Sequence, residues 1–313
     1  MTGRRKGESE LGAIRKLQGR RLGRAGRKRL FIISMLTVPA VHFIVFWVWV
    51  NLDSILLVFQ NNIGEWVGLT NIKWVFNGFT NNPYLDMTEA MRNTLIFFAW
   101  NFFVETPIAV VLAYIFFKKL PGRKFFTVCL YLPSIITTTV MVSVFKSAIS
   151  VDGPISALWQ TMGKIWTYPL TNEKTSMITL LVYQLWTGYG LNIILFHSAM
   201  KRIHREIFEA AAMDGITTFK ELTHIILPLI WPTVSAMLIV SVAGIFGTQG
   251  PILLFTNGDY GTMTISHAMY LQYKEYGNVP RAAAIGLIFT VIGLPLVFFS
   301  RWCTNKIGGE YEY

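Results

Sequence analysis

Apolar residues run along most of this chain in blocks long enough to cross a lipid bilayer, and shorter polar stretches separate them. A helix needs about 20 apolar residues to span the hydrocarbon core. Blocks of this length occupy residues 31–50, 94–117, 125–146, 177–199, 229–254 and 282–300. The pattern predicts an all-α polytopic membrane protein with six transmembrane helices.

The first block, residues 31–50, carries no charge and is too long for the core of a signal peptide. No small-residue cleavage site follows it, so we interpret it as a retained signal anchor. The predicted organisation is a basic tail over residues 1–30, a first transmembrane helix and outer loop over 31–87, one transmembrane domain over 88–305 and a short tail over 306–313. No second globular domain is expected.

Lysine and arginine set the predicted orientation. Of the 28 Lys and Arg residues, 21 lie in the N-terminal tail, the loops at 118–124 and 200–228, and the C-terminal end. Short basic loops stay in the cytoplasm, so both termini are predicted to be cytoplasmic. A net charge of +11 would suggest nucleic acid for a soluble protein, but here the basic residues flank apolar blocks. We therefore expect anionic lipid and no nucleic acid beside the tail, at about 1 kcal/mol per basic residue.

A polar segment between the fourth and fifth blocks has the pattern of a helix–turn–helix. Residues 204–212 are good helix formers, and Gly215 supplies a stop because glycine takes the left-handed C-terminal position without strain. Thr218 and Glu221 have the spacing of a capping box, which predicts a second helix that runs to Pro228. Both ends are tethered to spanning helices, which disfavours a DNA-reading pair. The segment is either an ordinary polar loop or, as we favour, a docking element for a cytoplasmic protein.

Motifs in and around this segment resemble those of bacterial ABC importer permeases. The EAA loop of that family is matched, at the family's spacing, by Glu209-Ala210-Ala211, Asp214-Gly215 and Ile226-Leu227-Pro228. Further similarities extend from about Thr88 to residue 300 and include Asn93-Thr94, Pro121-Gly122, Tyr131-Leu132-Pro133, Asp152-Gly153-Pro154 and Leu185-Trp186-Thr187-Gly188-Tyr189. The outer turn at Thr256-Asn257-Gly258 departs from the family, because Asp259-Tyr260 replaces its usual Gly-Pro.

The resemblance implies the type I ABC importer transmembrane fold, with residues 201–228 as the coupling loop that sits in a cleft of the ATP-binding subunit. The residues implied for this contact are Glu209, Ala210, Ala211, Asp214, Gly215, Leu227 and Pro228. Three kinds of partner are implied as well: a second permease subunit in a heterodimer, a dimer of ABC ATPases and an extracytoplasmic solute-binding protein. The chain itself would hold no cofactor, because ATP and Mg²⁺ belong to the ATPase, and it would lie in a prokaryotic cytoplasmic membrane.

The similarity is strongest to permeases of the maltose and glycerol-phosphate type, which implies import of a sugar or oligosaccharide. Carried over by position, the solute pathway comprises Gln184, Trp186, Gly188, Ser241 and Thr248. Aromatic faces stack on sugar rings, and amide and hydroxyl groups match sugar hydroxyls. For Trp186 two interpretations remain open, a sugar contact and a side chain that fills the helix bundle.

Glu105 lies within a spanning block, where a charge costs about 2.5–3.5 kcal/mol on insertion scales. It must be paired, protonated or in contact with a polar cavity. This residue also permits an alternative function, an ion-gradient-driven secondary transporter or channel with Glu105 as the carrier. An enzyme is not expected, because the sequence has no G-x-x-x-x-G-K-[ST] loop, no G-x-S-x-G elbow and no Cys/His metal cluster. Cys129 and Cys303 are predicted to be free thiols.

Overall fold

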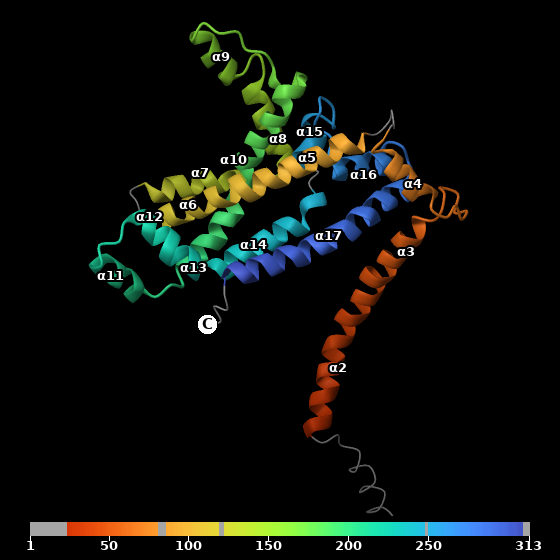
Figure 1. Cartoon of the computed structure of the whole chain (residues 1–313), viewed down its shortest axis with the longest axis horizontal. Coiled ribbons are helices and arrows are strands. Elements are labelled where there is room, and N and C mark those ends of the chain that lie inside the picture. The colour runs from red at the N-terminus through yellow and green to blue at the C-terminus, as the bar shows by residue number, and fades with distance from the viewer. Residues whose placement is uncertain (1–23, 81–85, 119–121, 248–249, 309–313) are drawn as a thin grey trace, which may run out of the picture. The chain divides into compact units, whose positions relative to one another are not determined.

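The chain divides into two units, Met1–Leu56 and Leu57–Tyr313, each of which is described by itself. The computed structural model describes residues 24–80, 86–118, 122–247 and 250–308 (Figure 1). All of its regular elements are helices, and the described residues form no strand, with one isolated bridge between Gln60 and Trp66. The predicted all-α class is therefore confirmed for this part of the chain.

The described residues of the first unit form one long helix that contains the predicted span 31–50. It consists of α2 (Arg24–Phe43), the π-helix η1 (Ile44–Trp49) and α3 (Val50–Leu57), which together run from Arg24 to Leu57. No residue in its most apolar stretch is buried. Such a helix satisfies its own backbone groups but leaves its apolar side chains to be covered by lipid or by other helices.

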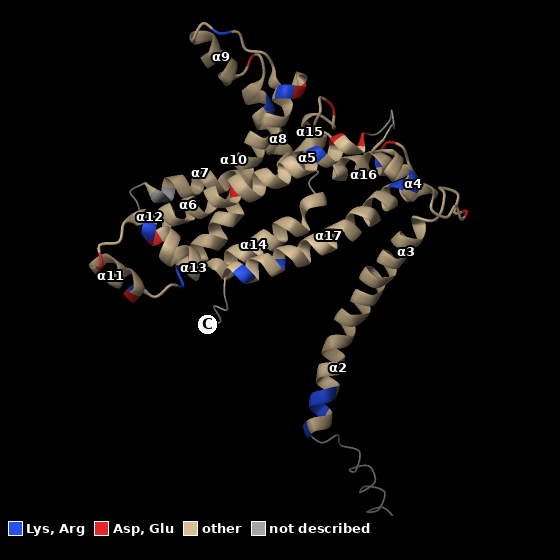
Figure 2. Cartoon of the chain, viewed as in Figure 1, with Lys and Arg blue, Asp and Glu red and all other residues tan. Residues whose placement is uncertain are grey.

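The second unit begins with elements whose bounds are α4 (Thr70–Asn77), α5 (Met87–Trp100), η2 (Asn101–Glu105), α6 (Thr106–Phe117), α7 (Arg123–Ile135), α8 (Thr138–Ile149), α9 (Pro154–Thr161), η3 (Pro169–Thr171) and α10 (Glu173–Met200). It continues through α11 (Arg205–Met213), α12 (Thr218–Lys220), η4 (Glu221–Ile226), α13 (Leu227–Leu229), α14 (Trp231–Ala243), η5 (Ile245–Gly247), α15 (Gly250–Phe255), α16 (Ile265–Lys274) and α17 (Val279–Gly308). Most charged residues of this unit lie near helix ends and in loops (Figure 2).

Among the described residues, four unbroken helices are long and apolar enough to cross a membrane, and two bent pairs could raise the number to six. The unbroken helices are Arg24–Leu57, Met87–Phe117, Glu173–Met200 and Val279–Gly308. The predicted spans 125–146 and 229–254 are not straight helices. The first bends by 111° between α7 and α8, and the second is bent by 74° before α14.

Local chemistry explains both breaks. Pro133 lies in the last turn of α7, and Ile136 then adopts an extended backbone with φ −74° and ψ 147°. Proline removes a backbone donor and crowds the preceding turn, which favours a break there. In the other pair, Ile230 leaves the helical conformation with φ −94° and ψ 2°, and Pro232 in the first turn of α14 has no N–H to continue the preceding helix. Helix α14 ends at Ala243 and is followed by Gly244 and the short 3₁₀ turn η5.

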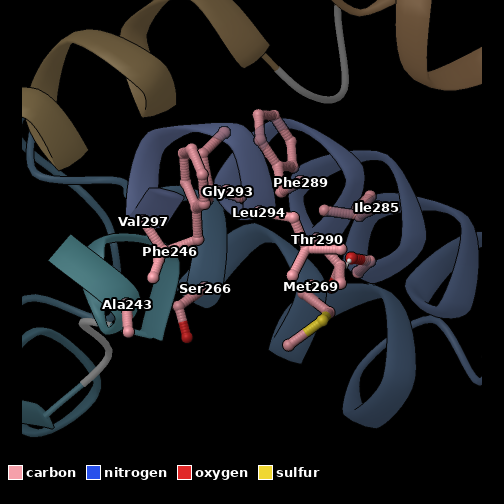
Figure 3. Close-up of a pocket in the computed structure, with 12 residues that line it drawn as sticks. Ala243, Phe246, Ser266, Met269, Ile285, Phe289, Thr290, Gly293, Leu294 and Val297 are labelled. Atoms are coloured by element: carbon pink, nitrogen blue, oxygen red, sulfur yellow. Dashed lines mark hydrogen bonds between the residues drawn. The ribbon is translucent and has the colours of Figure 1, made fainter. Parts of the chain in front are cut away.

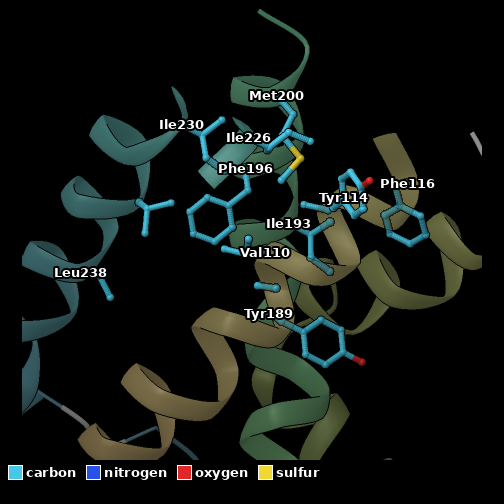
Figure 4. Close-up of a cluster of buried hydrophobic side chains, with 13 residues drawn as sticks. Val110, Tyr114, Phe116, Tyr189, Ile193, Phe196, Met200, Ile226, Ile230 and Leu238 are labelled. Atoms are coloured by element: carbon cyan, nitrogen blue, oxygen red, sulfur yellow. The ribbon is translucent and has the colours of Figure 1, made fainter. Parts of the chain in front are cut away.

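Three clusters of buried side chains hold the second unit together. The first joins α6, α10, η4 and α14 and includes Phe196, Ile226 and Leu238 (Figure 4). The second joins α4, α5, α16 and α17, and the third joins α5, α8, α10 and α15. Because lipid is as apolar as these side chains, close packing and interhelical hydrogen bonds stabilise such a bundle more than water exclusion does.

Candidate functional site

A group of polar side chains lies in the middle of the second unit, where three helical segments meet. Asn101 and Glu105 belong to η2, Gln184 to α10 and Ser241 to α14. We call these four residues the Glu105 cluster. Glu105 is only 3% exposed, and none of the described basic residues forms an ion pair with it. The carboxyl group is hydrogen-bonded instead, which meets one of the requirements for a buried carboxylate.

The hydrogen bonds of the Glu105 cluster connect its members in a fixed order. Gln184 Nε2 donates to Glu105 Oε2 over 3.3 Å, and the Asn101 side chain is hydrogen-bonded to the same carboxyl group. Ser241 Oγ donates to Asn101 Oδ1 over 2.5 Å. The π-helical turn of η2 places Asn101 and Glu105 on one face, and turns of this kind are frequent at functional sites.

Two cavities adjoin the cluster, and Gln184 lines both. The smaller one is about 190 Å³ and also contacts Asn101, Ser241 and Phe97. The larger one is about 350 Å³, and its polar lining includes Ser134, Thr138 and Thr187. Cavities of this size with convergent amide and hydroxyl groups have the chemistry to bind a polar, uncharged molecule.

The predicted pathway residues occupy different places. Gln184 and Ser241 are brought together through Asn101 and face a cavity. Gly188 has another role in the packing, because a Cβ at this position would collide with the Glu105 carboxyl group. Trp186 packs against Phe145 of the third core cluster, with ring centroids 5.9 Å apart, which favours the core interpretation for this side chain. Thr248 lies outside the described residues.

A third cavity, of about 440 Å³, lies between α14, α16 and α17 (Figure 3). Its walls are mostly apolar, with Phe246 and Phe289 in ring contact at 4.9 Å. Ser266 and Thr290 are the hydroxyl-bearing side chains in its lining, and the Thr290 hydroxyl donates to its own helix at Gly286. This cavity therefore offers packing space and little polar recognition.

The predicted docking segment forms a short helix at the edge of the second unit (Figure 1). One face of α11 packs inward, where Ala211 is buried and Phe208 contacts Phe117 at 5.1 Å between ring centroids. The other face is exposed and carries Glu209 and Ala210. Glu209 Oε1 accepts from Arg205 Nε over 2.7 Å, one turn earlier. A half-covered helix with a small residue on its free face allows close approach by another protein.

The end of α11 has a Schellman motif. Gly215 has φ +66°, its N–H donates to Ala212 O, and Ile216 N–H donates to Ala211 O. These two bonds satisfy carbonyls that the helix end would otherwise leave open. The predicted stop at Gly215 is thus confirmed, and Asp214 is the exposed C-cap residue. Leu227 and Pro228 are half-buried in α13, and Leu227 packs against the first core cluster.

The predicted capping box is wrong. The second helix begins after Thr217, whose side chain makes no cap hydrogen bond, and Thr218 is already its first residue. Glu221 instead pairs with Lys118 at the end of α6, at 2.6 Å between Nζ and Oε1. The Tyr114 hydroxyl donates to Thr218 O over 3.2 Å. A tertiary ion pair therefore outcompetes the local cap and ties the start of the second helix to α6.

Sequence reasoning missed Asn101 and Lys118. Asn101 precedes Glu105 by four residues, so helical spacing alone would have placed it on the same face. Lys118 gave no such signal, because its partner lies more than a hundred positions away in the chain. Both cysteines are free, as predicted. Among the described residues, no group of His, Cys, Asp and Glu could hold a metal ion.

Comparison with known proteins connects these features to a family. Residues 105–308 match the family described as the binding-protein-dependent transport system inner membrane component. The chain is 28% identical over 287 residues to the arabinooligosaccharides transport system permease protein AraP of Bacillus subtilis (strain 168), covering 88% of this chain and 89% of AraP. It is 25% identical to the lactose transport system permease protein LacF of Rhizobium radiobacter, covering 90% of this chain and 98% of LacF.

Solved structures agree on the fold. A chain of a bacterial ABC transporter involved in the import of the acidic polysaccharide alginate superposes with a TM-score of 0.79 at 21% identity, covering 90% of this chain and 98% of that one. The family match covers more than half of the sequence and includes Glu105, Gln184 and Ser241 of the Glu105 cluster, the helix α11 and the Lys118–Glu221 pair. The chain therefore belongs to the family of binding-protein-dependent transport system inner membrane components.

Proposed function

We propose that this chain is the permease subunit of an ATP-driven, binding-protein-dependent importer for a sugar or oligosaccharide. Membership of the family makes it a multi-pass membrane component of a transport system and not the ATPase. The observation that carries the proposal is the geometry of α11, a short helix with one packed face, one free face and a rigid Schellman end. When a separate protein binds such an element and moves it, the displacement is transmitted to the helices against which the element packs.

Sugar as the solute is supported by the relatives and by the chemistry of the cavities. The similar proteins named above carry arabinooligosaccharides and lactose in their names, and the alginate importer takes up a polysaccharide. The amide and hydroxyl groups of Gln184 and Ser241 suit sugar hydroxyls. Gln184, Gly188, Ser241 and Thr248 remain the proposed pathway positions, Gly188 through the room it leaves for Glu105.

The full arrangement in the membrane is part of the proposal. Each bent pair counts as one span, which gives six, and both termini lie in the cytoplasm of a bacterium. The domain boundaries are those predicted from the sequence, with residues 88–305 as the permease domain and 201–228 as the coupling loop. A second permease, two ATPase subunits that bind ATP and Mg²⁺, and an external solute-binding protein complete the transporter.

The test combines co-purification with a paired substitution. Gly215→Pro cannot keep a φ of +66°, so it should release the ATPase and abolish ATP-dependent uptake. Gly163→Pro is the matched control, since Gly163 ends α9 with φ +72° and the same pair of backbone bonds. That variant should keep the ATPase bound. An intact complex without an ATPase, or uptake in ATP-free vesicles driven by a proton or sodium gradient, would refute the proposal and favour a secondary transporter.

A further inference from the structure

We propose that Glu105 fixes the direction of the hydrogen bonds in its cluster, so that the groups offered to the cavities are acceptors. A pathway lined in this way selects neutral, hydroxyl-bearing solutes and excludes carboxylated ones. The inference rests on the proposed function and specifies its substrate class. Glu105 is a positioning residue in this scheme, because it acts through Gln184 and Asn101 and does not itself line either cavity.

The orientation of Gln184 is the first step. A side-chain amide has donors on its nitrogen and acceptor sites on its oxygen. Its Nε2 donates to Glu105 Oε2, so its Oε1 points away from the carboxyl group. Oε1 is buried and has no hydrogen-bond partner among the described residues. Because Gln184 lines both cavities, this oxygen can accept a hydrogen bond from a solute.

The orientation of Ser241 is the second step. Asn101 directs its amide nitrogen at Glu105, which leaves Oδ1 to accept the Ser241 hydroxyl proton over 2.5 Å. A hydroxyl has one proton, so the remaining capacity of Ser241 Oγ is as an acceptor. Ser241 lines the smaller cavity beside Gln184. One buried carboxyl group thus turns two separate side chains into acceptors at the same place.

The choice between solutes follows from this polarity. A sugar hydroxyl can donate a proton to Gln184 Oε1 or to Ser241 Oγ. A carboxylate has only acceptor oxygens, so it needs donors or cations when it leaves water. No Lys, Arg or His is among the described residues that line the two cavities. In the smaller cavity, a carboxylate would therefore meet the oxygens of Gln184 and Ser241 and lose its hydration without replacement.

Gly188 holds the arrangement in place. A side chain at this position would collide with the Glu105 carboxyl group, so α10 and η2 approach closely only because Gly188 has no Cβ. This packing keeps the carboxyl group between the two amides and away from the cavities.

The charge of the solute differs among similar transporters. One similar permease is named for lactose, a neutral sugar, and one similar structure belongs to a transporter involved in the import of acidic alginate.

The test measures equilibrium binding of solutes to the complete permease–ATPase complex in lipid nanodiscs. The binding protein is left out, so that any difference in affinity between solutes arises in the permease. The probes are radiolabelled digalactose and digalacturonate, which differ only at C6, together with lactose and arabinotriose. The wild-type complex should bind at least one neutral probe at least about tenfold more tightly than digalacturonate, the factor that one misdirected hydrogen bond produces. Glu105→Gln keeps the shape but adds donors, which lets the amides flip, so this preference should shrink several-fold.

Two further variants make the result interpretable. Ser241→Ala removes one acceptor and leaves Glu105 intact, so it should weaken binding of the neutral probe while digalacturonate binding stays low. Glu275→Gln makes the same chemical change at an exposed position at the end of α16 and should bind every probe as the wild type does. If Glu105→Gln does not assemble, the Ser241→Ala result alone decides for or against the acceptor polarity.

The remaining outcomes separate the inference from the proposed function. Equal binding of digalactose and digalacturonate by the wild type would overturn the inference and leave a sugar importer standing. An unchanged preference in an assembled Glu105→Gln complex would remove Glu105 from its role. Failure of every probe to bind would overturn the sugar importer itself and the inference with it.

Discussion

The ion pair between Lys118 and Glu221 joins α6 to the segment that follows α11, and breaking it should loosen that connection. Lys118 Nζ donates to Oε2 of Glu221 over 2.7 Å and lies 2.6 Å from Oε1, which accepts no hydrogen bond from the described residues. The two side chains differ in environment, since the Lys118 side chain is 38% exposed and the Glu221 side chain 11%. This asymmetry makes the prediction quantitative.

Exposed pairs contribute about 0–1 kcal/mol, and removing one partner of a buried pair costs about 3–5 kcal/mol. Lys118→Met leaves a buried carboxylate without its cation, which we expect to cost about 2–3 kcal/mol of unfolding free energy. Glu221→Gln leaves a lysine whose ammonium group can reach water, and we expect about 1 kcal/mol. Because 1.4 kcal/mol is a factor of ten in an equilibrium constant, the ratio of folded to unfolded segment should fall by about 30- to 150-fold in Lys118→Met and by about fivefold in Glu221→Gln.

The assay is hydrogen exchange of residues 205–230 in the complete transporter, with the solute imported per ATP hydrolysed measured in proteoliposomes. Lys118→Met should expose the segment more than Glu221→Gln and should lower the transport ratio more. The swapped pair, Lys118→Glu with Glu221→Lys, should recover part of both losses. Arg205→Met is a control for thermal stability only, because the Arg205 side chain is 90% exposed. Equal effects of the two single variants, or a swap no better than either, would refute the reasoning.

Three other expectations follow from particular residues. Gly215→Ala should cost about 1 kcal/mol of stability and also lower ATPase stimulation, whereas Gly163→Ala, with a similar positive φ, should show the stability loss alone in thermal unfolding and ATPase assays. Asn93→Leu leaves the carbonyls of Gly261 and Met263 without their donor, so thermal unfolding should show a loss of about 1–3 kcal/mol. Burial lowers the pKa of His267 below its ordinary 6.5, so protons bind the unfolded chain first and stability should fall as pH drops below that value. His267→Gln should remove this pH dependence in the same measurement.

The lengths of the apolar blocks predicted the positions of the long helices, but they did not predict where these helices bend. The blocks at 94–117 and 177–199 lie within single long helices, as their composition requires. The block at 125–146 contains Pro133, whose missing backbone donor is not recorded by hydropathy, and the helix breaks three residues later. Bends of this kind depend on which neighbours satisfy the freed backbone groups, and those neighbours come from elsewhere in the chain.

The candidate site was predicted in part, for a reason that its residues make clear. Glu105 stood out because a carboxylate is rare in an apolar block, and Gln184 and Ser241 came from a family resemblance. The connection between them depends on Asn101, a residue unremarkable by itself, and on the missing Cβ of Gly188. Such pairings across helices have no periodic signal, so the sequence alone does not reveal them. The capping-box prediction was wrong for the same reason, because Glu221 forms an ion pair with the distant Lys118.

The Glu105 cluster and the Lys118–Glu221 pair lie at opposite ends of helix α6. Glu105 immediately precedes α6 and Lys118 immediately follows it, so about 20 Å of helix separates the Glu105 cluster from the ion pair. No glycine interrupts α6, and its proline lies in the first turn, where it does not weaken the helix. Its inner face packs against α10, which carries Gln184 and Gly188. Because α11 contacts the end of α6 through Phe208 and Phe117, we expect a displacement of α11 to move α6 as a rigid helix and with it the Glu105 carboxyl group. The side chains that line the cavities need not change for this to happen. The arrangement requires that Lys118→Met also alter the solute affinity of the cluster, and an affinity that stays unchanged would mean that the two regions move independently.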